Sequence, residues 1–144
     1  MIIVGYQGIG KSTLASKNYR FIDLESTSFW KNGKRLDDWY YYYINVAEHL
    51  DQLNKYIFVS SHDVVKNELR NRGIEYKVIF PALELKEKWL EKLKERYNKD
   101  NSDKNKKALD FAVEFYDIGI NNLMNEHNKI IIKDINYNLE DYFI

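Results

Sequence analysis

Eight residues near the start of the chain, Gly5 to Ser12, have the types and spacing of a phosphate-binding site. They read GYQGIGKS: a glycine, four further residues and then Gly-Lys-Ser, the pattern of the phosphate-binding loop or Walker A motif. Glycines let the backbone turn tightly and direct successive N–H groups at a phosphate. Lys11 supplies a charge for the β and γ phosphates, and Ser12 a hydroxyl group for Mg²⁺. The pattern predicts a site for ATP and Mg²⁺ made of Gly5, Tyr6, Gln7, Gly8, Ile9, Gly10, Lys11, Ser12 and Thr13.

The residues on either side of this loop favour the same interpretation. Met1 to Val4 is a short apolar run that predicts a buried strand, and Lys11 to Tyr19 predicts a helix. A helix that begins at the loop directs its first N–H groups and the positive end of its dipole at a bound anion. The strand, the glycine loop and the helix thus follow one another in the order that phosphate binding requires.

Two carboxylates, Asp23 and Glu25, belong to the next predicted strand, Arg20 to Glu25. Side chains two apart on a strand point to the same side, and parallel strands end at the sheet edge where ligands bind. We therefore expect both carboxylates to face the space beside the loop. Asp23 is the candidate for orienting Mg²⁺ or the phosphate acceptor, and Glu25 for contacting the acceptor. An edge strand with one solvated face is the alternative explanation of the pair.

The stretch Ser26 to Arg35 predicts a loop with a turn at Asn32-Gly33, and Leu36 to Leu53 predicts a helix. Four consecutive tyrosines, Tyr40 to Tyr43, point all round that helix, so some of them must face solvent, a cleft or a partner. The sequence leaves open which ones do. The apolar positions at spacings of three and four that predict the helix are Trp39, Tyr43, Val46, Ala47 and Leu50.

The third predicted strand, Tyr56 to Ser61, is followed by His62 and by a helix from Asp63 to Gly73. Many phosphate-loop enzymes end this strand in a Walker B aspartate that binds Mg²⁺. Asp63 comes one or two places later, which disfavours an ATP-driven motor and leaves open whether Asp63 substitutes for that residue. His62 is a candidate substrate contact, with a structural hydrogen bond as the alternative.

The second half of the chain continues the alternation of strands and helices. Its predicted elements are a strand at Tyr76–Pro81, a helix at Leu83–Tyr97, a mobile polar connector at Asn98–Lys107, a helix at Ala108–His127, a strand at Lys129–Ile135 and a short helix at Leu139–Phe143. The first helix carries Lys88, Lys92 and Arg96 at spacing four, with a solvated, ion-paired face as the alternative explanation. The long helix is expected to bury Phe111, Ala112, Phe115, Gly119, Leu123 and Met124.

Composition bounds the class of protein. The 144 residues, of which 44% are hydrophobic, predict one domain spanning residues 1–144. The 22 basic and 22 acidic residues give zero formal net charge, which argues against nucleic acid as a partner. The chain has no cysteine and no apolar run near the ~20 residues of a membrane span. The first strand begins at Met1 and leaves no room for a signal peptide, so we expect a cytoplasmic protein. A homodimer is left open.

Alternating strands and helices predict an α/β fold, in which helices cover both faces of a five-stranded parallel sheet. With GYQGIGKS at the end of its first strand, the chain resembles the small phosphate-loop kinases: the nucleoside monophosphate kinases and their shikimate and gluconate kinase cousins. The resemblance implies a three-layer α/β/α P-loop NTPase fold with strand order 2-3-1-4-5. It also implies an acceptor-binding region at 26–53 and a lid at 83–107. Size and residue usage are similar to those of phage deoxynucleotide kinases.

The leading hypothesis is an ATP- and Mg²⁺-dependent kinase of a nucleoside monophosphate, with a deoxynucleotide favoured by the phage resemblance. Lys11, Asp23 and Arg96 are the candidate catalytic residues, and Ser12 and Asp23 the candidates for Mg²⁺. The family lid carries several arginines, whereas Arg96 is the only arginine after Arg72 here. The candidates for contact with the nucleotide acceptor are Asp23, Glu25, Arg35, Trp39, His62 and Lys92, of which Arg35 would bind the acceptor's own phosphate.

Two further hypotheses stay open at this point. In a kinase of a nucleoside or small hydroxyl metabolite, Asp23 or Glu25 would accept the hydroxyl proton. In a nucleotide-binding regulator without catalysis, the loop would bind ATP only, which the displaced Asp63 favours. A GTPase switch is disfavoured because the chain contains neither a DxxG-type switch motif nor an NKxD-type base-reading motif.

Overall fold

The computed structural model of the chain describes residues 1–32 and 34–143. The turn expected at Asn32-Gly33 falls partly on Gly33, which lies outside the described residues. The described chain forms an α/β structure with a five-stranded parallel sheet, as the sequence predicts. None of the helices in the described residues combines the length and the apolar composition that crossing a membrane requires.

The strands of the sheet arise from the five apolar stretches expected to form them. They are β1 (Ile2–Gly5), β2 (Phe21–Asp23), β5 (Tyr56–Ser60), β6 (Tyr76–Pro81) and β7 (Lys129–Ile132). The sheet order is β2-β5-β1-β6-β7. It differs in its numbering from the expected 2-3-1-4-5 because two short strands, β3 (Trp30–Lys31) and β4 (Lys34–Arg35), come between the second and third strands of this sheet.

Five α-helices lie in the described residues: α1 (Lys11–Lys17), α2 (Trp39–Asp51), α3 (Asp63–Asn71), α4 (Lys86–Lys99) and α5 (Asp103–Met124). Three short 3₁₀ helices accompany them: η1 (Ser26–Phe29), η2 (Leu83–Leu85) and η3 (Leu139–Phe143).

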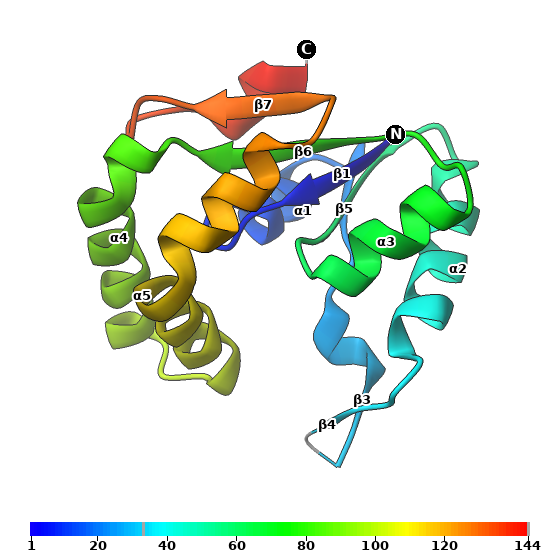
Figure 1. Cartoon of the computed structure of the whole chain (residues 1–144), viewed down its shortest axis with the longest axis horizontal. Helices are drawn as coiled ribbons and strands as arrows, with labels where there is room; N and C mark the ends of the chain where they lie inside the picture. The colour runs from blue at the N-terminus through cyan, green and yellow to red at the C-terminus, as the bar shows by residue number, and fades with distance from the viewer. Residues whose placement is uncertain (33, 144) are drawn as a thin grey trace. The chain divides into compact units, whose positions relative to one another are not determined.

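The structure divides into two compact units. Unit 1 comprises Met1–Gly5 with Gly10–Lys77. In it β2, β5 and β1 pair in parallel, and α2 lies beside α3 (Figure 1). Its core is built from side chains that are fully buried, among them Ile3, Phe58, Tyr43, Ile44 and Leu69. Unit 2 comprises Tyr6–Ile9 with the chain from Val78 onward.

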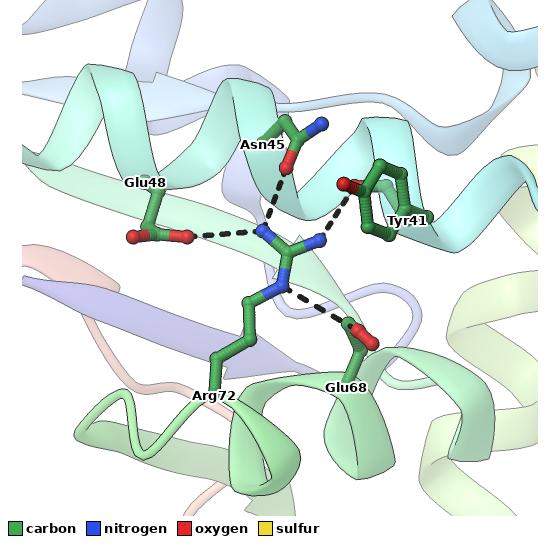
Figure 2. Close-up of polar contacts among 5 residues, drawn as sticks. All are labelled: Tyr41, Asn45, Glu48, Glu68 and Arg72. Carbon is green, nitrogen blue, oxygen red and sulfur yellow. Dashed lines mark hydrogen bonds and ion pairs between the residues drawn. The ribbon is translucent and has the colours of Figure 1, made fainter.

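In unit 1, Arg72 joins α2 to α3. The Arg72 guanidinium, just after α3, donates to Asn45 Oδ1 at 2.7 Å, Glu48 Oε1 at 3.0 Å and the Tyr41 carbonyl at 3.0 Å, all on α2 (Figure 2). It also bonds Glu68 on its own helix at 3.4 Å. These contacts assign Arg72 to holding α2 against α3.

In unit 2, β6 pairs with β7 in parallel and α4 runs beside α5 (Figure 1). Trp89 of α4 is fully buried. Tyr116 of α5 donates its hydroxyl hydrogen to the Ala82 carbonyl at 2.9 Å. A Cβ at Gly119 would lie 3.8 Å from the Tyr6 ring, an ordinary van der Waals contact, so this position has room for a methyl group.

Two predicted loops are wrong. Residues 26–31 form η1 and β3, and residues 34–35 form β4, which pairs with β3 through Trp30 and Arg35. The connector predicted at 98–107 is mostly helical, since α4 extends to Lys99 and α5 begins at Asp103. Ser102 caps α5 by accepting the Asn105 N–H at 3.2 Å, and the buried Asn105 amide donates to the Asp100 carbonyl at 2.9 Å. This capping outweighs the polar composition of the segment.

The buried face predicted for the long helix is also partly wrong. Phe111, Phe115 and Met124 are exposed, at 45%, 38% and 40%. Non-helical backbone angles at Phe115 (φ −124°, ψ 15°) kink α5 in the middle of the pattern. The residues that α5 buries are Asn105, Ala112, Tyr116, Ile120 and Leu123. Val46, expected on the apolar face of α2, is exposed as well.

Candidate functional site

The loop between β1 and α1 has the backbone angles that its glycines permit. Gly8 has φ +82° and Gly10 has φ +102°, in the left-handed region that other residues rarely adopt. Gly10 directly precedes Lys11, the first residue of α1. A side chain at Gly8 would also be blocked, because its Cβ would lie 2.7 Å from Leu93 Cδ2. Both positions therefore need glycine.

Within unit 2, the Tyr6–Ile9 segment of the loop is held by neighbouring residues. Tyr6 and Ile9 are each 1% exposed, and the Tyr6 N–H donates to the Ile79 carbonyl at 3.0 Å. The Trp89 indole N–H donates to the Gln7 carbonyl at 2.9 Å, and the Tyr137 hydroxyl donates to the Ile9 carbonyl at 2.6 Å. The segment from Tyr6 to Ile9 is thus anchored by buried side chains and hydrogen bonds.

In unit 1, Lys11 folds back over the start of the loop. Its Nζ donates to the Gly5 carbonyl at 3.0 Å. The ammonium group is therefore held at the first glycine of the motif, six residues earlier in the chain. Ser12 and Thr13, in the first turn of α1, are exposed.

The carboxylates Asp23 and Glu25 lie at the end of β2, near Tyr43. Asp23 is the last strand residue, and Glu25 lies two residues beyond it, so the prediction that both belong to the strand is wrong. The Tyr43 hydroxyl donates to the Leu24 carbonyl at 2.5 Å and accepts the Ser60 N–H at 2.9 Å, which ties the ends of β2 and β5 together. Burial raises the pKa of Tyr43, and the charges of Asp23 and Glu25 raise it further.

Arg35 projects from the β3–β4 hairpin into an aromatic environment. Its guanidinium carbon lies 5.0 Å from the ring centre of Trp30 and 5.1 Å from that of Trp39. One Nη donates to Ser26 Oγ at 3.0 Å, and Nε is buried without a hydrogen-bond partner in the described part of the chain. Burial lowers the pKa of Arg35.

His62 is distant from Arg35 in the sequence but contacts the same Trp39 indole. Its ring stands edge-on to Trp39 with centroids 5.2 Å apart, and its Nδ1 lies 2.8 Å from Ser60 Oγ. Although part of His62 is solvent-exposed, crowding by protein atoms lowers its pKa to about 4, and the charges of Arg35, Lys11 and Lys66 act in the same direction. Asp63 opposes them. The imidazole is therefore neutral at pH 7.

Asp63 does not stand in a group of metal ligands. It is the first residue of α3, its side chain is 75% exposed, and it pairs with Lys66 Nζ at 3.2 Å. Across residues 1–32 and 34–143, no three His, Asp or Glu side chains gather as a metal site would require. Of the sequence candidates for Mg²⁺, Ser12 and Asp23 both belong to unit 1.

Lys92, expected to contact the acceptor, lies in unit 2 among aromatic rings. Its Nζ is 4.3 Å from the ring centre of Trp89 and 4.7 Å from that of Tyr137, and it donates to the Tyr137 hydroxyl at 2.9 Å. Burial, together with the nearby charge of Arg96, lowers the pKa of Lys92 to about 8. Arg96 is half-buried on the same helix, and Lys88 is exposed.

Several of the predicted acceptor-binding residues thus fall into two clusters, one in each unit. Arg35, Trp39 and His62 form one cluster in unit 1, and Lys92 belongs to an aromatic cluster with Trp89 and Tyr137 in unit 2. Sequence reasoning missed three residues at these sites: the buried Lys66, Trp89 as a loop donor and Tyr137. Trp89 was recognisable only as part of an apolar stripe, and no local pattern marks Lys66 or Tyr137.

Comparisons of the chain with protein-family models, with curated proteins and with solved structures return no match.

Proposed function

We propose that the protein is an ATP- and Mg²⁺-dependent phosphotransferase that phosphorylates a nucleoside monophosphate. The observation that carries this proposal is the loop: the GYQGIGKS sequence combines with left-handed backbone angles at Gly8 and Gly10 and with Lys11 returned to the Gly5 carbonyl. A parallel sheet whose first strand leads into this loop supports the finer description as a three-layer P-loop NTPase fold.

The proposed chemistry needs positioning and charge neutralisation more than covalent participation. The acceptor oxygen forms a bond to the γ phosphorus while the bond to the β–γ bridging oxygen breaks, and ADP leaves. The N–H groups of the loop bind the β phosphate, Lys11 neutralises charge on the β and γ oxygens, and Ser12 holds Mg²⁺ with help from Asp23. Arg96 would stabilise charge on the transferring group.

We assign the acceptor's phosphate to Arg35. Contact with Trp30 and Trp39 fixes the plane of the guanidinium group, and a planar guanidinium suits bidentate binding of a phosphate. The cation also balances the repulsion that Asp23 and Glu25 exert on an anionic acceptor. His62, neutral and adjacent to Trp39, can hydrogen-bond the acceptor without adding charge.

A kinase of an uncharged hydroxyl acceptor is the second candidate. The observation that favours it is the position of Asp23 and Glu25, whose charges both act on Tyr43 at the end of β2. Either carboxylate would serve as the base that accepts the hydroxyl proton.

The experiment that tests the proposal is a coupled ADP-release assay with Mg·ATP and a panel of ribo- and deoxynucleoside monophosphates, nucleosides and sugar acids. We expect ADP release above the ATP-only background with at least one monophosphate. Release with an uncharged alcohol alone would establish the second candidate. Binding of Mg·ATP without release in any reaction would identify a non-catalytic nucleotide-binding protein.

A further inference from the structure

Two carbonyl groups of the phosphate loop accept hydrogen bonds from side chains far away in the sequence. Trp89 Nε1 donates to the Gln7 carbonyl at 2.9 Å, across 82 positions of the chain. Tyr137 donates its hydroxyl hydrogen to the Ile9 carbonyl at 2.6 Å, across 128 positions. The two carbonyls are two residues apart, and both belong to unit 2 together with their donors.

Because peptide groups are planar, these contacts also determine the direction of the neighbouring Gly8 and Gly10 N–H groups. A trans peptide is planar, and its carbonyl oxygen and amide hydrogen point in opposite directions. The Gln7 carbonyl shares a peptide with the Gly8 N–H, and the Ile9 carbonyl shares one with the Gly10 N–H. No cis peptide occurs in the described chain. The N–H groups of Gly8 and Gly10 therefore point away from Trp89 and Tyr137.

The two donors are themselves held in place. The rings of Trp89 and Tyr137 stack with centroids 6.0 Å apart and planes 16° apart. Lys92 Nζ lies over both rings and donates to the Tyr137 hydroxyl at 2.9 Å. One turn beyond Trp89 on α4, Leu93 packs against Gly8. The Tyr137 hydroxyl thus accepts one hydrogen bond from a cation and donates another to the loop, an arrangement that strengthens its donation.

We propose that Trp89 and Tyr137 are positioning residues for nucleotide phosphate binding: by fixing the Gln7 and Ile9 carbonyls on one side of the loop, they present the Gly8 and Gly10 N–H groups to the phosphates on the other. This inference rests on the proposed function, because it assigns a triphosphate to the loop. Neither side chain touches the phosphate in this account. Each acts through the peptide group to which it donates, Trp89 on Gly8 and Tyr137 on Gly10.

The test uses Tyr137→Phe, which removes one hydroxyl group and keeps the ring that stacks on Trp89. Tyr142→Phe is the matched control, since Tyr142 is exposed and its ring lies tilted against that of Tyr137 with centroids 6.5 Å apart. Affinities for Mg·ATP and for Mg·tripolyphosphate are measured by calorimetry on the full chain. We expect Tyr137→Phe to weaken both by about tenfold, the effect of one lost hydrogen bond to a buried carbonyl, and Tyr142→Phe to leave both unchanged.

An amide spectrum separates orientation from general loosening of the fold. Tyr137→Phe should shift the ¹⁵N–¹H resonance of Gly10 and reduce its response to Mg·tripolyphosphate, and Trp89→Phe should do the same at Gly8. If wild type binds and Tyr137→Phe binds equally well with an unmoved Gly10 resonance, this inference is wrong while the proposed function stands. If wild type binds neither Mg·ATP nor Mg·tripolyphosphate, the proposed function fails and this inference fails with it.

Discussion

The guanidinium carbon of Arg35 lies 5.1 Å from the ring centre of Trp39. The His62 ring stands edge-on to the same indole, with ring centres 5.2 Å apart. One tryptophan on α2 thereby brings together a cation from the β3–β4 hairpin and a neutral imidazole from the end of β5. The relationship joins three of the residues proposed to bind the acceptor.

Arg35→Ala should raise the KM for the acceptor by roughly 10- to 100-fold, because hydrogen bonds to a charged group contribute about 1.5–3 kcal/mol. The KM for ATP should stay nearly unchanged. Arg35→Lys keeps the charge but loses the planar group, so it should recover only part of the effect. Steady-state kinetics with both substrates varied makes the comparison. A silent Arg35→Ala, together with loss of activity on an uncharged alcohol in Glu25→Gln, would favour the hydroxyl kinase instead.

The His62 environment predicts a pH dependence. Its pKa of about 4 in the folded protein is below the ordinary value of 6.5, so folding favours the neutral imidazole. This contribution to stability is present above pH 6.5 and is lost as the pH falls toward 4. Chemical denaturation of His62→Gln should therefore show a flatter dependence on pH in this window, with His127→Gln as the control.

The same environment can be measured directly by titrating the His62 ring resonances. Arg35→Met removes a neighbouring cation that lowers the His62 pKa, so the pKa should rise in this variant toward 6.5. An unchanged pKa in Arg35→Met would contradict the cluster of Arg35, Trp39 and His62.

Gly8→Ala tests the geometry of the loop. Alanine at Gly8 would meet both a left-handed φ of +82° and Leu93 Cδ2 at 2.7 Å. Gly73 is a matched control, since its φ is +66° and nothing lies within 4 Å of an added Cβ. We expect Gly73→Ala to lower the free energy of unfolding by about 1 kcal/mol without affecting Mg·ATP binding. Gly8→Ala should cost more stability and also weaken Mg·ATP binding; equal behaviour of the two variants would count against the loop.

Arg72→Met tests a residue assigned to stability alone. Because it removes hydrogen bonds to Asn45, Glu48 and the Tyr41 carbonyl, we expect it to lower the free energy of unfolding by about 1–3 kcal/mol. Both KM values should stay unchanged. Arg70→Met, on the exposed side of the same helix, should change stability by less. A larger effect on the acceptor KM than on stability would place Arg72 at the acceptor site.

Local patterns in the sequence predicted what depends on neighbouring residues. β6 forms at Tyr76–Pro81 as expected, because an apolar run there ends in the only proline of the chain. The glycines of the loop were recognisable since Gly8 and Gly10 need backbone angles that other residues avoid. The kink at Phe115 has no such local signal, and the sequence did not indicate that Tyr116 and Ile120, rather than Phe111 and Phe115, belong to the buried face of α5.

Contacts between residues far apart in the chain could not be predicted from local sequence patterns. Nothing near Tyr137 indicates that its hydroxyl group reaches the Ile9 carbonyl, and nothing near Lys92 indicates that it lies over two aromatic rings. Helical periodicity placed Lys92 in a row with Lys88 and Arg96, yet burial follows from what packs on each position. Polar composition likewise misled at 98–107, where Ser102 and Asn105 start a helix.

The central claim is that the loop transfers the γ phosphate of ATP, and Lys11→Met tests it most directly. Chromatography would follow conversion of the best monophosphate from the substrate panel to its diphosphate by wild type and by Lys11→Met. Lys11 is half-buried and its hydrogen bond to the Gly5 carbonyl contributes only about 1 kcal/mol, so thermal unfolding of the variant should stay close to that of wild type. Loss of one preorganised charge predicts a fall in turnover of about 10²–10³. Equal turnover by the two folded proteins would contradict the account.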